Sequence, residues 1–210
     1  MSRLIESIEP EGKRQRVCLD DGTDFLLYQA EVSQYALKAG EELSEDQYHI
    51  LLSEIFFPRA AKRAMRLLEV RDYAEKRLRQ KLETSGYPQE AVDYAIEYVS
   101  RFHYLDDRRM AAAYVHAHQE NKSRRRIALD LTRRGIDRDL IEQTLDAEYT
   151  ASEEDQIRSL LHKKGYDPTV SDPRERGKLY RFLAYRGFSA SSIMKALQMS
   201  GCESFKRDRF

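Results

Sequence analysis

Two pairs of residues near the middle of the chain have side chains that could bind a metal ion. Asp106 and Asp107 are adjacent in the sequence YLDD, and a polymerase uses paired carboxylates to hold Mg²⁺ when a hairpin aims both at the metal. Here a helix is expected to follow at once, so an N-cap and a favourable charge at the helix dipole explain the pair better. His116 and His118 would point to different faces of a helix, unlike the i, i+4 pairs that bind metals. We therefore expect no metal and no cofactor.

Other arrangements that carry out catalysis are missing from the sequence. It contains no glycine-rich phosphate loop, no activated nucleophile and no paired acid and base. Tyrosines could stack on the bases of a single strand. However, Tyr73, Tyr94, Tyr98 and Tyr114 have helical spacings and are expected to fill gaps between helices, with their hydroxyls at the edge. No residue pattern in the sequence therefore points to catalysis.

A cluster of basic residues is the strongest candidate for binding a partner. The candidate contact residues are Lys122, Arg124, Arg125, Arg126, Arg133 and Arg134, together with Arg108 and Arg109 upstream. An arginine can make bidentate hydrogen bonds to a phosphate or to a carboxylate, so the cluster could contact a DNA backbone or an acidic protein surface. A merely solvated helix face is the alternative.

The charge of the chain is unevenly distributed, although 36 basic and 36 acidic residues give a net charge of zero. Residues 1–58 contain 5 basic and 12 acidic residues, whereas residues 59–138 contain 19 basic and 12 acidic residues. This order suggests interaction with polyanions or with a protein surface of mixed charge. Charge alone does not distinguish between them.

The N-terminal residues are expected to form a small antiparallel sheet with short helices. The runs RLIESIE, RQRVCLD and DFLLYQ carry β-branched or aromatic residues and are separated by the turn sequences PEGK and DDGT. AEVSQYALKAG then has the apolar spacing of a helix that ends at Gly40, and another helix is expected after Ser44, its N-cap. From Pro58 onward almost the whole chain is expected to be helical.

One fifteen-residue pattern occurs three times in the helical part, at residues 82–96, 131–145 and 183–197. It consists of Leu, three residues, Gly, a large apolar residue, four residues, Val or Ile, three residues, and Ile or Leu. Gly86, Gly135 and Gly187 are expected to have left-handed backbone just past a helix end, in a Schellman motif whose next residue packs on the preceding Leu. The last two apolar positions then share one face of the following helix. Each pattern therefore predicts a helix, a tight turn and a helix.

An amphipathic segment precedes each pattern, which makes three units of three helices. We expect an N-terminal segment at residues 1–57, repeats at residues 58–104, 105–151 and 152–200, and a polar tail at residues 201–210. The predicted fold class is mostly α, with three tandem three-helix repeats in an elongated array after a small β segment.

The cellular compartment can be inferred from the cysteines and from the hydropathy. Cys18 and Cys202 lie near opposite ends of the sequence without a second thiol or a suitably spaced histidine, which favours a reducing compartment. MSRLIESIEP lacks the apolar run of a signal peptide, and no segment approaches the roughly 20 apolar residues that span a bilayer. We expect a soluble cytoplasmic protein.

Three stretches of the helical part are the most distinctive: RDYAEKRLRQKLETSGY, FHYLDDRRMAAAYVHAHQENKSRRRIALDLTRRGI and YRFLAYRGFS. They resemble the RecX family, bacterial regulators of the RecA recombinase. The resemblance implies a non-enzymatic protein that binds in the groove of RecA filaments on single-stranded DNA and restrains recombination during DNA repair and the SOS response. We further expect a monomer that binds free DNA weakly.

Two other functions compete with this interpretation. A helix, a glycine-containing turn and a helix also outline the helix-turn-helix of DNA-binding transcription factors, but the second helix of each pattern is acidic or neutral, which argues against insertion into a major groove. A general helical-repeat scaffold that binds peptides is the other alternative. Pull-down partners would distinguish a recombinase regulator from a scaffold.

Overall fold

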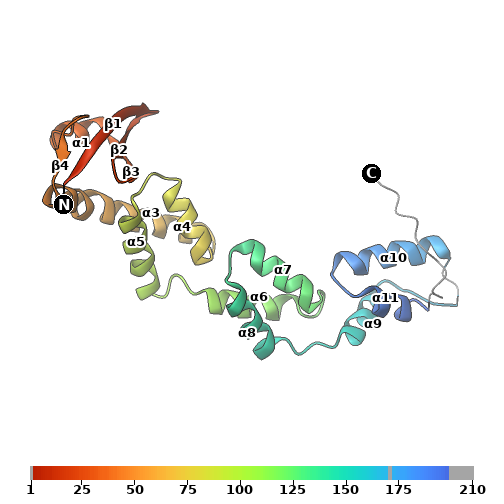
Figure 1. Ribbon diagram of the computed structural model, residues 1–210. Coiled ribbons are helices and arrows are strands. Elements are labelled where there is room, and N and C mark those ends of the chain that lie inside the picture. Colours follow the sequence, from red (N-terminus) through yellow and green to blue (C-terminus); the bar gives the residue numbers. More distant parts are fainter. Residues whose placement is uncertain (1, 170–171, 199–210) are drawn as a thin grey trace. The chain divides into compact units, whose positions relative to one another are not determined.

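The computed structural model describes residues 2–169 and 172–198. The chain divides into two units, one ending at Asp107 and the other beginning at Arg108 (Figure 1). The fold is mostly helical, with an antiparallel sheet at the N-terminus and three three-helix repeats, as predicted. The expected polar tail and Cys202 lie outside the described residues. None of the described helices is long and apolar enough to cross a membrane.

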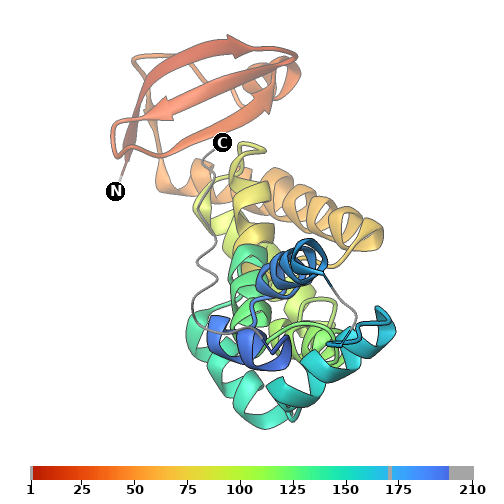
Figure 2. The same ribbon diagram turned by 90° about the vertical axis from the view of Figure 1, so that its right-hand side faces the viewer.

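The N-terminal sheet has four antiparallel strands in the order β3-β2-β1-β4 (Figure 2). These strands are β1 (Arg3–Glu11), β2 (Arg14–Leu19), β3 (Asp24–Tyr28) and β4 (Glu42–Leu43). The first three correspond to the runs expected from the sequence, and the turns between them contain Gly12 and Gly22 with positive φ. No sequence pattern indicates β4, because two residues are too few to show an alternation.

Helix α1 (Gln29–Gln34) is shorter than predicted, so the expectation that it ends at Gly40 is wrong. The helix stops in a Schellman arrangement at Ala36, where φ is 52° and the Leu37 N–H donates to the Val32 carbonyl at 3.0 Å. Gly40 instead donates its N–H to the carbonyl of Ile5 at 2.8 Å. The pairing of this segment with β1 therefore prevents the helix from continuing.

A continuous helical run crosses the boundary that the sequence places between residues 57 and 58. It consists of α2 (Glu45–Leu51), a π-helical turn η1 (Leu52–Phe56) and α3 (Phe57–Val70), and Ser44 caps its start as predicted. The π-helical turn lies just before Pro58, where a proline ring would otherwise meet the carbonyl four residues earlier. The sheet and the first repeat accordingly share one hydrophobic core.

The three repeats account for the other helices (Figure 1). The first repeat continues from α3 with α4 (Glu75–Glu83) and α5 (Gln89–Arg101); the second has α6 (Asp107–His118), α7 (Arg124–Arg134) and α8 (Arg138–Glu148); the third has α9 (Glu153–Lys163), α10 (Pro173–Tyr185) and α11 (Ala190–Ala196). The paired apolar positions of each fifteen-residue pattern are buried, as expected.

The three pattern glycines have the left-handed backbone that the sequence predicts. The φ angles are 79° at Gly86, 95° at Gly135 and 88° at Gly187. The residue after Gly135 donates its N–H to the Leu131 carbonyl at 3.2 Å, and the residue after Gly187 donates to the Leu183 carbonyl at 3.4 Å. These bonds define the Schellman motif, so the motif is confirmed at Gly135 and Gly187. At Gly86 the left-handed backbone is as predicted, but α4 already ends at Glu83 and the Gly86 N–H donates to the Glu83 carbonyl at 2.8 Å, so this stop is a different turn.

The turn at Gly86 also joins the first repeat to the sheet. The N–H of Leu26 in β3 donates to the Gly86 carbonyl at 3.0 Å, and a Cβ atom at Gly86 would overlap the Leu26 side chain. Glycine is therefore needed here for close approach of the two segments as well as for its backbone conformation.

Candidate partner-binding surface

Helix α7 positions most of the predicted basic cluster. It begins after Ser123, whose hydroxyl accepts the N–H of Arg126 at 3.2 Å, and this cap satisfies one free donor at the helix start. Ile127 and Leu131 are buried. Because these two residues fix the inward face, Arg125 lies on the exposed side of the helix.

Two of the predicted contact residues bind a carboxylate inside the second repeat. Lys122 Nζ lies 2.9 Å from Asp130 Oδ2 and Arg126 Nε lies 3.2 Å from Asp130 Oδ1. Lys122 also donates to the Tyr114 hydroxyl at 2.7 Å, and that hydroxyl donates to Asp130 at 3.1 Å. This network around Asp130 fixes both cations, and no sequence pattern except the i, i+4 spacing of Arg126 and Asp130 could have indicated it.

Burial and pairing act in opposite directions on the pKa values of this network. Partial burial favours the uncharged forms, but the hydrogen bonds and the opposite charges outweigh it, so the pKa of Lys122 is raised and the pKa of Asp130 is lowered. Both groups are therefore held in their charged forms. Their charges are largely paired with each other inside the second repeat.

Arg124 connects α7 to α8 through ion pairs. Its Nη2 lies 2.6 Å from Asp146 Oδ1 and 3.3 Å from Glu142 Oε2. The predicted triplet of arginines therefore divides by environment: Arg124 and Arg126 are ion-paired, whereas Arg125 forms no ion pair with a residue that the structure describes.

The other predicted contact residues are exposed. Arg133 and Arg134 lie at the end of α7, and the Arg134 guanidinium lies 4.6 Å from the centre of the Tyr114 ring. Arg108 and Arg109 are exposed near the start of α6, where Arg108 Nη2 donates to Gln143 Oε1 at 3.3 Å. The structure thus leaves five of the eight predicted side chains exposed to solvent, namely Arg108, Arg109, Arg125, Arg133 and Arg134.

The third repeat packs directly on the start of α7. The Ser123 N–H donates to the Arg186 carbonyl at 3.1 Å, and a Cβ atom at Gly187 would lie 2.6 Å from the Ser123 hydroxyl. The Arg126 guanidinium lies 4.8 Å from the centre of the Tyr185 ring. Contacts between the second and third repeats therefore hold the N-terminal end of the basic helix in place.

The side chains weighed as metal ligands have other roles in the described structure. Asp107 begins α6 and accepts the N–H of Glu75, the first residue of α4, at 3.0 Å, while burial raises the pKa of Asp107. His116 contacts Glu148 at 2.9 Å, and the His118 Nδ1–H donates to the Tyr114 carbonyl at 2.9 Å. Among the described residues no cluster of three or more His, Cys, Asp and Glu side chains could hold a metal ion.

The tyrosines pack at the edges of the helices. Tyr94 stacks on Phe57 with ring centres 4.4 Å apart, so it lies between α5 and α3 while 40% of its surface stays exposed. Tyr73 and Tyr98 are half-buried against the first core, and Tyr114 belongs to the Asp130 network described above.

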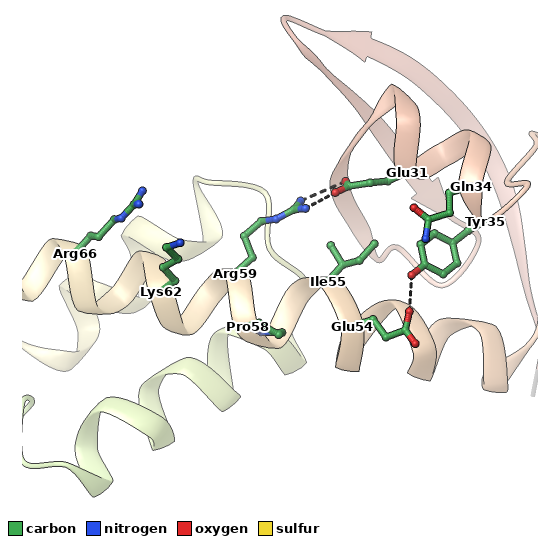
Figure 3. Close-up of a pocket in the computed structure, with 9 residues that line it drawn as sticks. All are labelled: Glu31, Gln34, Tyr35, Glu54, Ile55, Pro58, Arg59, Lys62 and Arg66. Carbon is green, nitrogen blue, oxygen red and sulfur yellow. Dashed lines mark hydrogen bonds and ion pairs between the residues drawn. The ribbon is translucent and has the colours of Figure 1, made fainter.

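A polar groove of about 630 Å³ lies between α1 and α3 (Figure 3). Arg59 makes a two-pronged contact with Glu31 across it, and the Tyr35 hydroxyl donates to Glu54 at 2.7 Å. The hydrogen bond to Glu54 raises the pKa of Tyr35. Both carboxylates in the groove are thus engaged by cationic or hydroxyl groups, which makes this a cross-linked structural contact rather than an acid–base pair.

Comparisons with known proteins agree on one family. Three family models match the chain: the first three-helix domain of RecX at residues 60–98, the second at residues 106–145 and the third at residues 152–197. The chain is 31% identical over 166 residues to a regulatory protein RecX of Caldanaerobacter subterraneus subsp. tengcongensis, covering 78% of this chain and 82% of that one. A relative with the same name from Clostridium beijerinckii is 24% identical and covers 96% and 97% of the two chains.

Solved structures support the fold. The structure described as a crystal structure of regulatory protein RecX has a TM-score of 0.55 and 22% identity, covering 94% of this chain and 100% of that chain. RecX from Lactobacillus salivarius has a TM-score of 0.51 and 19% identity, covering 68% and 95%. With matches to all three of its three-helix domains and a close relative along most of its length, this chain belongs to the RecX family of regulatory proteins.

Proposed function

We propose that this protein binds RecA filaments on single-stranded DNA and restrains the recombinase without catalysing a reaction of its own. The observation that carries the proposal is the match of all three helical repeats, in order, to the three domains of a family of regulatory proteins. A multi-repeat protein can contact several subunits of a filament at once, and multivalent contact raises affinity without requiring a deep pocket.

The exposed arginines of the second repeat are the proposed contacts. Arg125, Arg133 and Arg134 offer guanidinium groups that can bind a filament carboxylate or a phosphate. The paired residues Lys122 and Arg126 stabilise α7, the helix that carries these exposed arginines. A role as a major-groove reader is less well supported, because α8, the second helix of that repeat's pattern, has one basic and four acidic residues.

RecA-catalysed ATP hydrolysis on single-stranded DNA tests the proposal. We expect hydrolysis to fall as this protein is added, and we expect the variant with Arg125, Arg133 and Arg134 changed to Gln to require a higher concentration for the same effect. A variant with Lys76, Lys81 and Arg101 changed to Gln has the same loss of charge on the first repeat and serves as the control. No change in hydrolysis over a wide range of concentrations would overturn the proposal.

Salt dependence separates a filament binder from a general DNA binder. The binding of bare DNA is expected to weaken steeply with salt, since each phosphate contact contributes a slope of about −0.7 to −0.9 in log affinity against log salt. Binding to RecA-coated strands should persist at salt concentrations that abolish binding to bare strands. Fluorescence anisotropy with labelled strands measures both, and equal affinities with equal slopes would contradict the proposed partner.

A further inference from the structure

Helix α10 of the third repeat carries a row of cations that the basic cluster of the second repeat does not include. Arg174, Lys178 and Arg181 are exposed and recur at i, i+4 and i+7, and Tyr185 follows four positions later. At 3.6 residues per turn, these four side chains fall within about 60° of arc. The buried leucines of α10, Leu179 and Leu183, lie on the opposite side of the helix. The row therefore faces solvent along its whole length.

The cations on the helices of this chain fall into two groups. Some pair with an acid one turn away, as Arg79 does with Glu75 and Arg158 with Asp155, whereas others, such as Arg125, form no ion pair with a described residue. None of the three cations on α10 forms an ion pair with a described residue. Like charges at i and i+4 destabilise a helix by about 0.2–0.5 kcal/mol, so a row of unpaired like charges is more easily explained by a ligand than by helix stability.

An exposed aromatic ring ends the row. Tyr185 keeps 71% of its surface exposed, and the Arg126 guanidinium lies 4.8 Å from the centre of its ring. A second aromatic ring near the end of α10, that of Phe182, has the Arg186 guanidinium 3.8 Å from its centre. The end of α10 thus presents an aromatic ring supported by cations, next to the start of α7.

We propose that the Arg174, Lys178, Arg181 and Tyr185 face of α10 binds a single nucleic-acid strand. The three cations would contact successive phosphates, and one base would stack on Tyr185. Proteins that bind single strands without sequence preference combine a positively charged track with aromatic platforms in this way. A duplex fits less well because its base faces are already stacked. An acidic protein surface would match the cations but would leave the exposed ring unexplained.

The inference deepens the proposed function and rests on it only in placing the strand inside a recombinase filament. Three phosphate contacts at about −0.7 each give a salt slope near −2 for a single strand. Such a face binds bare DNA weakly at physiological salt. It could still contact the strand that a filament holds close to it.

Binding of a short labelled oligothymidine strand at low salt, without recombinase, tests the inference. The variant with Arg174, Lys178 and Arg181 changed to Gln should bind more weakly, with its salt slope reduced by about 2. The control changes Arg138, Arg158 and Lys163 to Gln, which removes the same charge from exposed positions elsewhere in the unit, and it should keep the wild-type slope. Circular dichroism verifies that each variant is folded.

The stacking contact has its own test. Tyr185→Leu keeps an apolar side chain beneath Arg126 but removes the ring, and it should weaken single-strand binding by at least about fivefold, the equivalent of roughly 1 kcal/mol. Its affinity for duplex DNA should not change. In addition, an iodouracil-substituted strand should crosslink to Tyr185 under ultraviolet light.

Several outcomes would overturn the inference. It fails if the wild type does not bind the strand, if the α10 triple variant matches its control, or if Tyr185→Leu weakens single-strand and duplex binding equally. It also fails if the α10 variants bind bare strands normally but lose affinity for recombinase without DNA, because the face would then bind protein. Inhibition of RecA-catalysed ATP hydrolysis is measured separately for each variant. A failure of strand binding by α10 can therefore be distinguished from a failure of the proposed function.

Discussion

Replacing Gly187 by Ala should destabilise the third repeat more than the same change at Gly165, although both glycines have left-handed backbone. The φ angle is 88° at Gly187 and 69° at Gly165, and both residues end a helix of the same repeat. A residue with a Cβ atom in this conformation costs about 1–2 kcal/mol. The backbone term is therefore similar at both sites and cancels in the comparison.

The difference between the two sites comes from packing. A Cβ atom at Gly187 would lie 2.6 Å from the Ser123 hydroxyl and 2.7 Å from the Arg126 Cβ, whereas nothing lies within 4 Å of a Cβ at Gly165. Neither neighbour of Gly187 can move freely, since the Ser123 hydroxyl caps α7 and the Arg126 Cβ is fixed to the helix backbone. Overpacking costs about 1–3 kcal/mol, so we expect a total of about 2–5 kcal/mol for Gly187→Ala and about 1–2 kcal/mol for Gly165→Ala.

Urea unfolding followed by circular dichroism measures the two changes in free energy. Hydrogen exchange at the Ser123 amide localises the effect, because this N–H donates to the Arg186 carbonyl across the contact between repeats. Exchange at this amide should accelerate in Gly187→Ala and stay near the wild-type rate in Gly165→Ala. Equal destabilisation and equal exchange in the two variants would refute the packing argument.

Three further predictions follow from single contacts. Asp130→Asn should lower the melting temperature at neutral pH, and the difference from wild type should shrink in acid. The pKa of Asp130 is lowered in the folded state, so its charge stabilises the fold above its ordinary pKa, and this stability is lost as the pH falls through the folded pKa. Melting curves measured across pH test this. Gly86→Ala should destabilise the first unit in urea unfolding, since the new methyl group would overlap Leu26. Arg125→Gln should change stability by no more than about 0.5 kcal/mol yet weaken filament binding, whereas Arg126→Gln should reduce both stability and binding, as calorimetry and anisotropy would show.

The helix stops could be predicted from the sequence because they depend on neighbouring residues. A left-handed glycine, the leucine four positions earlier and the apolar residue that follows lie within six residues of one another, so their spacing alone identifies the Schellman motif. The same locality made Ser44 recognisable as an N-cap. Because the same helix-stop pattern recurs three times, the sequence also predicted three three-helix repeats in the helical part.

The departures from prediction all involve contacts between distant residues. Helix α1 ends early because the following segment pairs with β1, and Gly40 donates to the Ile5 carbonyl 35 positions earlier in the chain. Asp107 opens α6 as its position suggests, but its carboxylate also caps α4 through the Glu75 N–H. Neither partner can be identified from spacing in one sequence.

The basic cluster illustrates the same limit for a functional site. Charge and position predict eight contact residues, but they do not show that Lys122 and Arg126 share Asp130 or that Arg124 bridges to Asp146. The half-buried pairs with Asp130 make Lys122 and Arg126 part of the scaffold, because separating either pair leaves a charge without its partner. The Arg124–Asp146 pair is exposed and contributes little to stability. The structure therefore reduces the proposed contact surface to the exposed arginines.

The third pattern glycine links the repeat architecture to the proposed binding surface. Gly187 lets the turn of the third repeat approach the start of α7, and that contact fixes Ser123, which caps the helix carrying the exposed Arg125. Tyr185 packs beneath Arg126 at the same place. A surface held by such contacts loses little conformational freedom when a partner binds, and this preorganisation favours affinity. A helix stop that sequence spacing explains as a turn thus also positions the side chains that are proposed to bind.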